Sequence, residues 1–480
     1  MFDVSKDTPA PTANPVPPAV HWRTYRDKFR FFMKFDIAPR RSPPTALDTI
    51  VLDVRAPPPY QRDDTDSELA LLADMNAEQV AEAARAAASL PDDDRRTRLC
   101  AALPGASKVT IVCFNDDAPS RAIVHNLVLL LGAGTRLQDL TGQCDWPLDG
   151  AAFDRLPDTV CKLNVGAFAQ GRWPTRWPAA LADLALVDTA IGSVPAHTLP
   201  GTVRSFVCRA ASANAPGAGP PCLRPGVLPA GLERFLCLDD VSLRTPGGQP
   251  VSVETGALPD GLVYLAITGI RWMAEPAALP ASLHTLLLGS NEAVPRWLPS
   301  GLRALHIGSL SQSEMALLPA GLRRLTCARA FEFPNPRKAG RLPAHLGALN
   351  LRTATTSGVW KACMLPRALD ELTLPDRFNG GIPRGGGLPD TVRRLEFGRQ
   401  FVGTSRLQLP HALETLVLGR SFDAERLLAA PDQLPPGLHT VVGCKRTFLG
   451  EVPEFVELHL YDESPDEVAA HPADLAFCID

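Results

Sequence analysis

The sequence predicts a repeat solenoid, a stack of short parallel strands, that follows a mixed α/β N-terminal cap region. Thirteen prolines recur between Pro157 and Pro435 at intervals of 19 to 30 residues, about 23 on average, and twelve of them follow Leu. Apolar residues stand three, six and usually eight positions after each proline, which gives the pattern LPxxLxxLxL. Self-similarity at this period is typical of repeat architectures rather than of separate globular domains.

Each repeat supplies one short strand. The last two apolar residues of the pattern lie two apart, which is the periodicity of a strand with one buried face. About 23 residues per repeat leave too little chain for a crossover with a full helix, so we expect extended or short 3-10 return segments. The Leu-Pro step favours an extended corner before each strand. Because one repeat cannot bury its leucines alone, the repeats stack and share them as a parallel sheet.

Composition excludes several other classes of protein. The 480 residues include 47 Pro and 36 Gly, but 45% are hydrophobic, which argues against wholesale disorder. The net charge of -4 gives no reason to expect a nucleic-acid partner. The eleven cysteines form no CxxC pair, so we expect neither a zinc site nor a disulfide framework, and a reducing compartment is favoured.

Targeting and catalytic motifs are not found in the sequence. There is no signal-peptide pattern and no apolar run of bilayer length, so we expect a cytoplasmic protein without a membrane partner. Phosphate-binding loops, HExxH, GxSxG and calcium loops are also not found. We therefore expect no enzyme, no metal and no cofactor.

Four regions follow from these patterns. Residues 1–20 are rich in Pro, Ala and Thr and are expected to be disordered. Residues 21–150 form the cap region, residues 151–461 hold an array of about 13–14 repeats, and residues 462–480 contain six acids and no Lys or Arg. We expect this last segment to be a solvated acidic tail.

The cap region contains several predicted elements. An alanine-rich segment predicts a helix over residues 66–90, SKVTIVCF predicts a strand, and APSRAIVHNLVLLLG predicts a helix. Ile50, Leu52 and Val54 alternate as in a half-buried strand. These elements are either a separate domain or irregular repeats that cap the array.

The segment 21–41 has two interpretations. It carries seven Lys or Arg and two Asp among many aromatic residues, a composition that binds nucleic acid or anionic membranes. Its apolar residues also alternate from Phe29 to Ile37, as in a strand of the cap. We favour the structural interpretation.

The repeat resembles known leucine-rich repeats. LPxxLxxLxLG resembles the proline-led form of the leucine-rich-repeat consensus. Phe331, Phe378, Phe401 and Phe422 stand twelve residues after a repeat proline, and segments such as LPDRFNGGIPRGGGLPDTVRRLEFGRQF are similar to the FNIP repeat of amoebae and their large DNA viruses. Other units, with Asn291 at the Phe position, are closer to the LPX-type repeats of bacterial effectors. The resemblance covers residues 156–443 and implies a curved solenoid used for protein binding.

Three groups of residues are candidates for a functional site by composition. Cys208, Cys237 and Cys327 occupy inward repeat positions, so we expect buried core thiols rather than nucleophiles. Cys478 and Asp480 match the Cys-x-Asp of some bacterial ubiquitin ligases, but no chain follows them here to build the helical domain that carries it in those enzymes. The glycine-rich stretch Gly380 to Gly387 lies between two repeats and is expected to be a connecting loop.

The candidate binding residues lie between the leucines. Strand residues flanking the inward positions face outward, on the concave side of a leucine-rich-repeat sheet. The predicted partner-binding residues on that side are Arg234, Tyr264, Leu287, His306, Arg324, Asn350, Glu371, Arg394 and Glu396. Aromatic, Arg and apolar residues are enriched in interfaces. A face screened by the caps or by neighbouring loops is the alternative.

These observations predict a non-catalytic scaffold that binds a protein partner on the concave face. If the source is a virus or a secreting bacterium, the protein is expected to be a host-interaction factor in the host cytoplasm. Two alternatives stay open: an enzymatic or ubiquitin-ligase-associated effector with an unrecognised N-terminal domain, and a structural component of a virus particle. The oligomeric state does not follow from the sequence.

Overall fold

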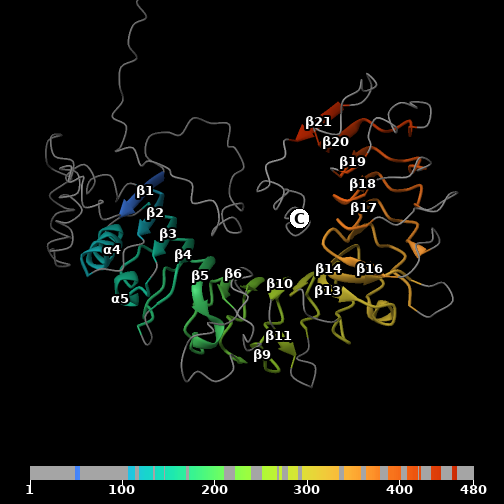
Figure 1. Ribbon diagram of the computed structural model, residues 1–480. Coiled ribbons are helices and arrows are strands. Elements are labelled where there is room, and N and C mark those ends of the chain that lie inside the picture. The colour runs from blue at the N-terminus through green and yellow to red at the C-terminus, as the bar shows by residue number, and fades with distance from the viewer. Residues whose placement is uncertain are drawn as a thin grey trace, which may run out of the picture. The chain divides into compact units, whose positions relative to one another are not determined.

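The chain divides into two units, Met1–Leu181 and Ala182–Asp480. The computed structural model describes residues 49–54, 106–113, 118–132, 136–144, 146–168, 172–209, 222–238, 251–267, 270–272, 279–289, 294–334, 340–357, 364–378, 388–401, 408–419, 421–422, 434–444 and 457–461 (Figure 1). The predictions for residues 1–20, 21–41, 66–90, 380–387 and 462–480 lie outside these residues, as do Asn291, Cys478 and Asp480.

Unit 1 contains a parallel sheet with two helices. Its elements are β1 (Thr49–Val54), β2 (Lys108–Cys113), α4 (Ala118–Leu131), β3 (Asp139–Cys144), α5 (Gly150–Phe153) and β4 (Lys162–Val165). The strands pair in chain order, β1 with β2, β2 with β3 and β3 with β4. The predicted strands at Ile50 and at Val109 and the predicted helix after Ala118 are therefore confirmed. Helix α4 joins β2 to its neighbour β3, and α5 lies in the chain between β3 and β4.

Helix α4 covers the sheet with one apolar face. Val124, Leu127, Val128 and Leu131 are buried, and their spacing of three and four residues places them on one side of the helix. They lie over strands whose inward residues, such as Val109 and Leu140, are also buried. The helix contacts β1, β2 and α5.

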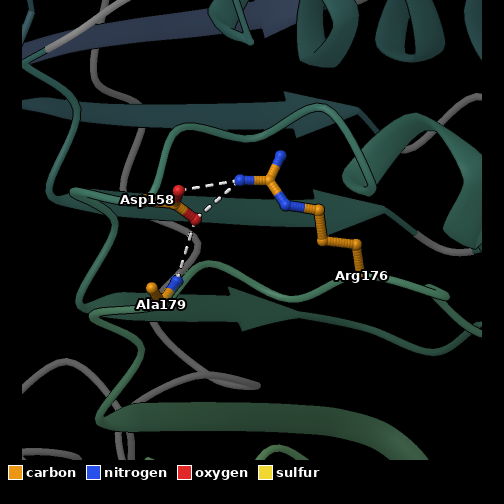
Figure 2. A network of polar contacts seen from close by, with 3 residues as sticks. All are labelled: Asp158, Arg176 and Ala179. Carbon is orange, nitrogen blue, oxygen red and sulfur yellow. Dashed lines mark hydrogen bonds and ion pairs between the residues drawn. The ribbon is translucent and has the colours of Figure 1, made fainter.

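Two aspartates join neighbouring turns of unit 1. Asp158 accepts two hydrogen bonds of 2.8 Å from the Arg176 guanidinium and one of 3.1 Å from the Ala179 N–H (Figure 2). Asp154 accepts hydrogen bonds from the Thr175 N–H (2.7 Å), the Thr175 hydroxyl (2.8 Å) and the Arg176 N–H (3.0 Å). Partial burial raises the pKa of Asp154, but these hydrogen bonds and the Arg176 charge lower it by more, so the net pKa lies below the ordinary value.

We expect Asp154→Asn to weaken unit 1 in a pH-dependent way. A carboxyl with a lowered pKa contributes stability above its ordinary pKa and loses it as the pH falls through the lowered value. The variant should be about 1 kcal/mol less stable at pH 7, and the difference should shrink as the pH falls below the ordinary carboxyl pKa and through the lowered pKa of Asp154. Urea unfolding across this pH range checks the result, with the exposed Asp390→Asn in unit 2 as control. An equal difference at all pH values would contradict the role of the ionised carboxyl.

Unit 2 is built on thirteen parallel strands in its described residues. They are β5 (Asp183–Ala190), β6 (Ser205–Arg209), β8 (Arg234–Leu238), β10 (Tyr264–Ile267), β12 (Thr285–Leu288), β13 (Ala304–Leu310), β14 (Arg324–Glu332), β15 (Ala348–Asn350), β17 (Glu371–Thr373), β18 (Arg394–Glu396), β19 (Thr415–Val417), β20 (Thr440–Cys444) and β21 (Glu457–Tyr461). Each strand pairs with the next, so the chain builds the sheet in sequence order (Figure 1). The last pairing aligns Leu458 with Val441, so β21, in the divergent segment VPEFVELHLY, adds a fourteenth repeat to the thirteen that begin at Pro157 to Pro435.

The return segments are short. Two contain 3-10 turns, η2 (Ile191–Ser193) and η3 (Glu314–Leu317), as predicted. Others add strands that the sequence did not predict. Strands β7 (Cys222–Leu223), β9 (Val251–Val253) and β11 (Ile270–Trp272) form a second parallel sheet, and β16 (Thr355–Ser357) pairs with the end of β14. Regular return segments of this kind satisfy their own backbone groups between stacked repeats.

The repeat proline begins a tight turn. In all thirteen repeats the proline carbonyl accepts a hydrogen bond of 3.0–3.2 Å from the N–H of the apolar residue three positions later. The carbonyl of the residue after that apolar position then accepts two N–H groups of the next repeat. Arg303, for example, accepts from Arg323 (2.8 Å) and Arg324 (2.9 Å). The turn therefore fixes the register of every strand on the one before it.

The leucine ladder forms the core. The apolar residues three, six and eight positions after each proline are exposed by 2% or less. Phe378, Phe397, Phe401 and Phe422 add a second buried stack, in which the rings of Phe397 and Phe401 lie 4.3 Å apart and nearly parallel. The glycine of the LxLG motif is required by close packing, because a Cβ at Gly398 would lie 1.9 Å from the Pro375 carbonyl oxygen.

Candidate partner-binding face

The outward residues of unit 2 form two straight rows across the sheet. The first row stands five positions after each repeat proline and includes Arg234, Tyr264, Arg324, Glu371 and Arg394. The second row stands seven positions after the proline and includes Leu287, His306, Asn350 and Glu396. The ladder pairings place all nine predicted binding residues in these two rows.

The part of the face on β8 to β14 is open in its first row. In its second row Leu236 and Ala266 are buried, and only the residues on β12 to β14 are partly exposed. The Arg234 guanidinium lies 5.4 Å from the centre of the Tyr264 ring, a cation–π arrangement between neighbouring strands. Arg234 is exposed, and Tyr264, Leu287, His306 and Arg324 are partly exposed. Burial lowers the pKa of His306, so this side chain presents a neutral imidazole at neutral pH. The open part thus combines two arginines with an aromatic and an aliphatic side chain.

The part of the face on β15 to β19 is closed in its second row. Asn350, Thr373, Glu396 and Val417 are buried, with 5–6% of each residue exposed. Glu396 forms an ion pair with Arg352, which follows β15 and reaches across β17. The Asn350 side-chain oxygen accepts a hydrogen bond of 3.0 Å from the Arg352 N–H.

This burial changes what the predicted binding residues offer. Asn350 and Glu396 are occupied by contacts within the chain, so neither presents an exposed polar group. Glu371 and Arg394 lie side by side in the first row and are half-buried. Reasoning from the repeat pattern placed all these residues in the correct rows. It missed Arg352, because that residue lies beyond the repeat motif.

A third row borders the face where the strands begin. We call it the edge row: it stands four positions after each repeat proline, directly before the strand. In two stretches of it, neighbouring repeats carry opposite charges. Arg204 lies 3.8 Å from Glu233, and Arg393 lies 3.4 Å from both Asp370 and Glu414. Opposite charges on adjacent strands stabilise a sheet, and like charges destabilise it.

At β13 and β14 the edge row carries two like charges instead. Arg303 and Arg323 are neighbours there, both are exposed, and neither forms an ion pair within the described part of the chain. His284 precedes them in the row and Gly347, which has no side chain, follows. Aligning the repeats on their prolines reveals this row from the sequence, but the sequence prediction of binding residues covers the strand residues alone.

The candidate nucleophiles lie in the core. Cys208, Cys237 and Cys327 are exposed by 2% or less, which confirms their inward positions. Burial raises the pKa of Cys208 and Cys327 far above that of a free thiol. In the residues that the structure describes, no group of three or more His, Cys, Asp or Glu side chains is placed to hold a metal ion. None of the helices in these residues has the length and apolar character needed to cross a membrane.

Comparison with known proteins gives matches among solved structures. No protein-family model and no curated protein matches the chain. Among solved structures, the chain is similar to CroV588, described as a novel circular LRR protein, with 16% identity and a TM-score of 0.46. The match covers 75% of this chain and 53% of the other, so the chain spans about half the length of that protein. With its proline turns, inward leucines and parallel ladder, the chain folds as a leucine-rich-repeat-like solenoid.

Proposed function

We propose that the protein is a non-catalytic scaffold that binds a protein partner on the open part of its strand face, between β8 and β14. The observation that supports this most is the contrast along the two rows. Arg234, Tyr264, Leu287 and Arg324 are accessible, whereas the second row from Asn350 to Val417 is closed. A partner that needs contact area therefore has the first row of β8 to β14 and the second row of β12 to β14 available.

The chemistry of the open part fits a protein interface. Tyr and Arg are the residues most often found at binding hot spots, and apolar neighbours exclude water around them. Because each side chain stands on a strand held by two neighbours, little ordering is needed on binding.

A paired substitution tests the proposal. Tyr264→Ala together with Arg324→Glu should reduce capture of the partner roughly tenfold or more. The matched control is Glu371→Gln together with Arg394→Gln, on the same first row beside the closed part, and it should retain the partner. Quantitative affinity capture with both full-length variants and the wild type measures the difference. Equal capture by all three proteins would contradict the site, and selective loss in the control would move it to β17 and β18.

We infer further that the repeats are of the FNIP type. Phe331, Phe378, Phe401 and Phe422 stand at the Phe position of that repeat and are buried, and the last three stack on one another. Units with other residues at this position are closer to LPX repeats. A host-interaction role in the cytoplasm of a host cell is part of the same proposal.

A further inference from the structure

The large exposed apolar residues in the described part of unit 2 stand close to repeat prolines in the sequence. We call the turn that leads into each strand the leading edge: it comprises the residues from two before each repeat proline to four after it. Val263, Trp297 and Leu317 are the large apolar residues with more than about a third of their surface exposed, and all three lie on the leading edge of the repeats that begin at Pro259, Pro299 and Pro319. Trp297 and Leu317 occupy the same position in consecutive repeats.

The two arginines of the edge row that form no ion pair with a described residue lie on the same stretch. Arg303 and Arg323 belong to the repeats of Trp297 and Leu317. The Arg303 carbonyl accepts the Arg323 N–H at 2.8 Å, so the two backbones are held one strand spacing apart. Two like charges at this distance repel each other unless an anionic group lies between them. The other arginines of the edge row, Arg204 and Arg393, have acidic neighbours within the chain.

The charge and apolar content of the leading edge match one segment of this chain. Residues 462–480 carry six acids and no Lys or Arg, together with Val468, Leu475 and Phe477. Carboxylates suit the paired guanidinium groups, and the apolar side chains suit Trp297 and Leu317.

The segment is also long enough. It follows β21, which is seven strand spacings from β13 in the order of pairing. Seven spacings amount to about 34 Å, whereas 19 extended residues reach about 60 Å.

We propose that the acidic segment 462–480 binds intramolecularly to the leading edge at Arg303, Arg323, Trp297 and Leu317. Its carboxylates neutralise the two adjacent arginines, and its apolar residues cover the exposed tryptophan and leucine. This replaces the expectation of a solvated tail. The proposal does not depend on a partner binding the strand face.

Zero-length cross-linking of the full-length protein tests the contact. A carbodiimide joins a lysine amine to a carboxylate with loss of water, so Arg303→Lys and Arg323→Lys keep the charge and introduce a reactive amine. Mass spectrometry should find amide bonds from these lysines to carboxylates of 462–480 in the monomer. About 0.5 M NaCl should reduce their yield several-fold. Arg393→Lys is the matched control, and its lysine should join Asp370 or Glu414, the acids that already flank it.

Three results would overturn the proposal. If the new lysines do not join the segment while Arg393→Lys joins its neighbours, residues 462–480 are solvated. If the joined species are dimers, the contact is with a second copy of the chain. If the segment joins Lys28 or Lys34 instead, it binds the basic region 21–41.

A second measurement does not rely on an introduced lysine. Arg303→Glu combined with Arg323→Glu should raise the rate of cleavage within 462–480 by a glutamate-specific protease roughly tenfold, because two weak exposed ion pairs and their apolar contacts are lost together. Glu414→Gln, which changes a charge of the edge row elsewhere, should leave the rate unchanged. An unchanged rate in the double variant would contradict the docked segment.

Discussion

Phe401→Ala is expected to destabilise unit 2 by about 3–5 kcal/mol, the range for removing a buried aromatic side chain. The Phe401 ring is 2% exposed and stacks on Phe397, Phe378 and Phe422, which come from three successive repeats. Its removal leaves a cavity that neighbouring repeats share. Because each repeat of a solenoid contacts only its neighbours, the loss should be concentrated between β17 and β19.

Hydrogen exchange and urea unfolding together measure this effect. Peptides that cover β17 to β19 should exchange much faster in Phe401→Ala, while those of unit 1 should keep their protection. Phe401→Leu retains most of the apolar volume and should cost about 1–1.5 kcal/mol. Arg377→Ala, at an exposed neighbouring position, should change stability by less than about 0.5 kcal/mol. A cost below about 1 kcal/mol for Phe401→Ala would show that the stack does not hold the repeats together.

The repeat array could be predicted in detail because one pattern recurs thirteen times. Each LPxxLxxLxL unit fixes its turn, its strand and its inward residues, and every strand repeats the register of the one before. Even the divergent Leu458 unit pairs as the pattern indicates. The additional strands β7, β9, β11 and β16 escaped prediction, because return segments vary in length and share no periodic signal.

The binding face could be predicted only in part. Periodicity tells which residues point outward, but not which outward residues the chain itself covers. Glu396 was selected as an accessible charge because its partner, Arg352, lies outside the strand pattern and two strands away. Arg303 and Arg323 are missing from the predicted binding residues for a related reason, because the edge row lies before the strand. Pairings across strands depend on the stacked structure, and the motif of a single repeat does not encode them.

The Glu396–Arg352 ion pair is expected to contribute strongly to local stability. Glu396→Ala should cost about 3–5 kcal/mol, because it leaves the Arg352 guanidinium largely buried without its carboxylate. Only 17% of the Arg352 side chain and 7% of the Glu396 side chain are exposed. Glu414→Ala removes an exposed partner of Arg393 in the next repeat, and should cost less than about 1 kcal/mol.

A double-mutant cycle separates the attraction of the pair from the cost of burying one charge alone. If the single losses arise from an uncompensated buried charge, Glu396→Leu combined with Arg352→Leu should recover most of the stability lost in Glu396→Ala. Urea unfolding of the wild type, Glu396→Leu, Arg352→Leu and the double variant provides the coupling energy. A cost below about 1 kcal/mol for Glu396→Ala would mean that water reaches this part of the second row. In that case Glu396 would again be available to a partner, and the binding face would extend beyond β14 to β18.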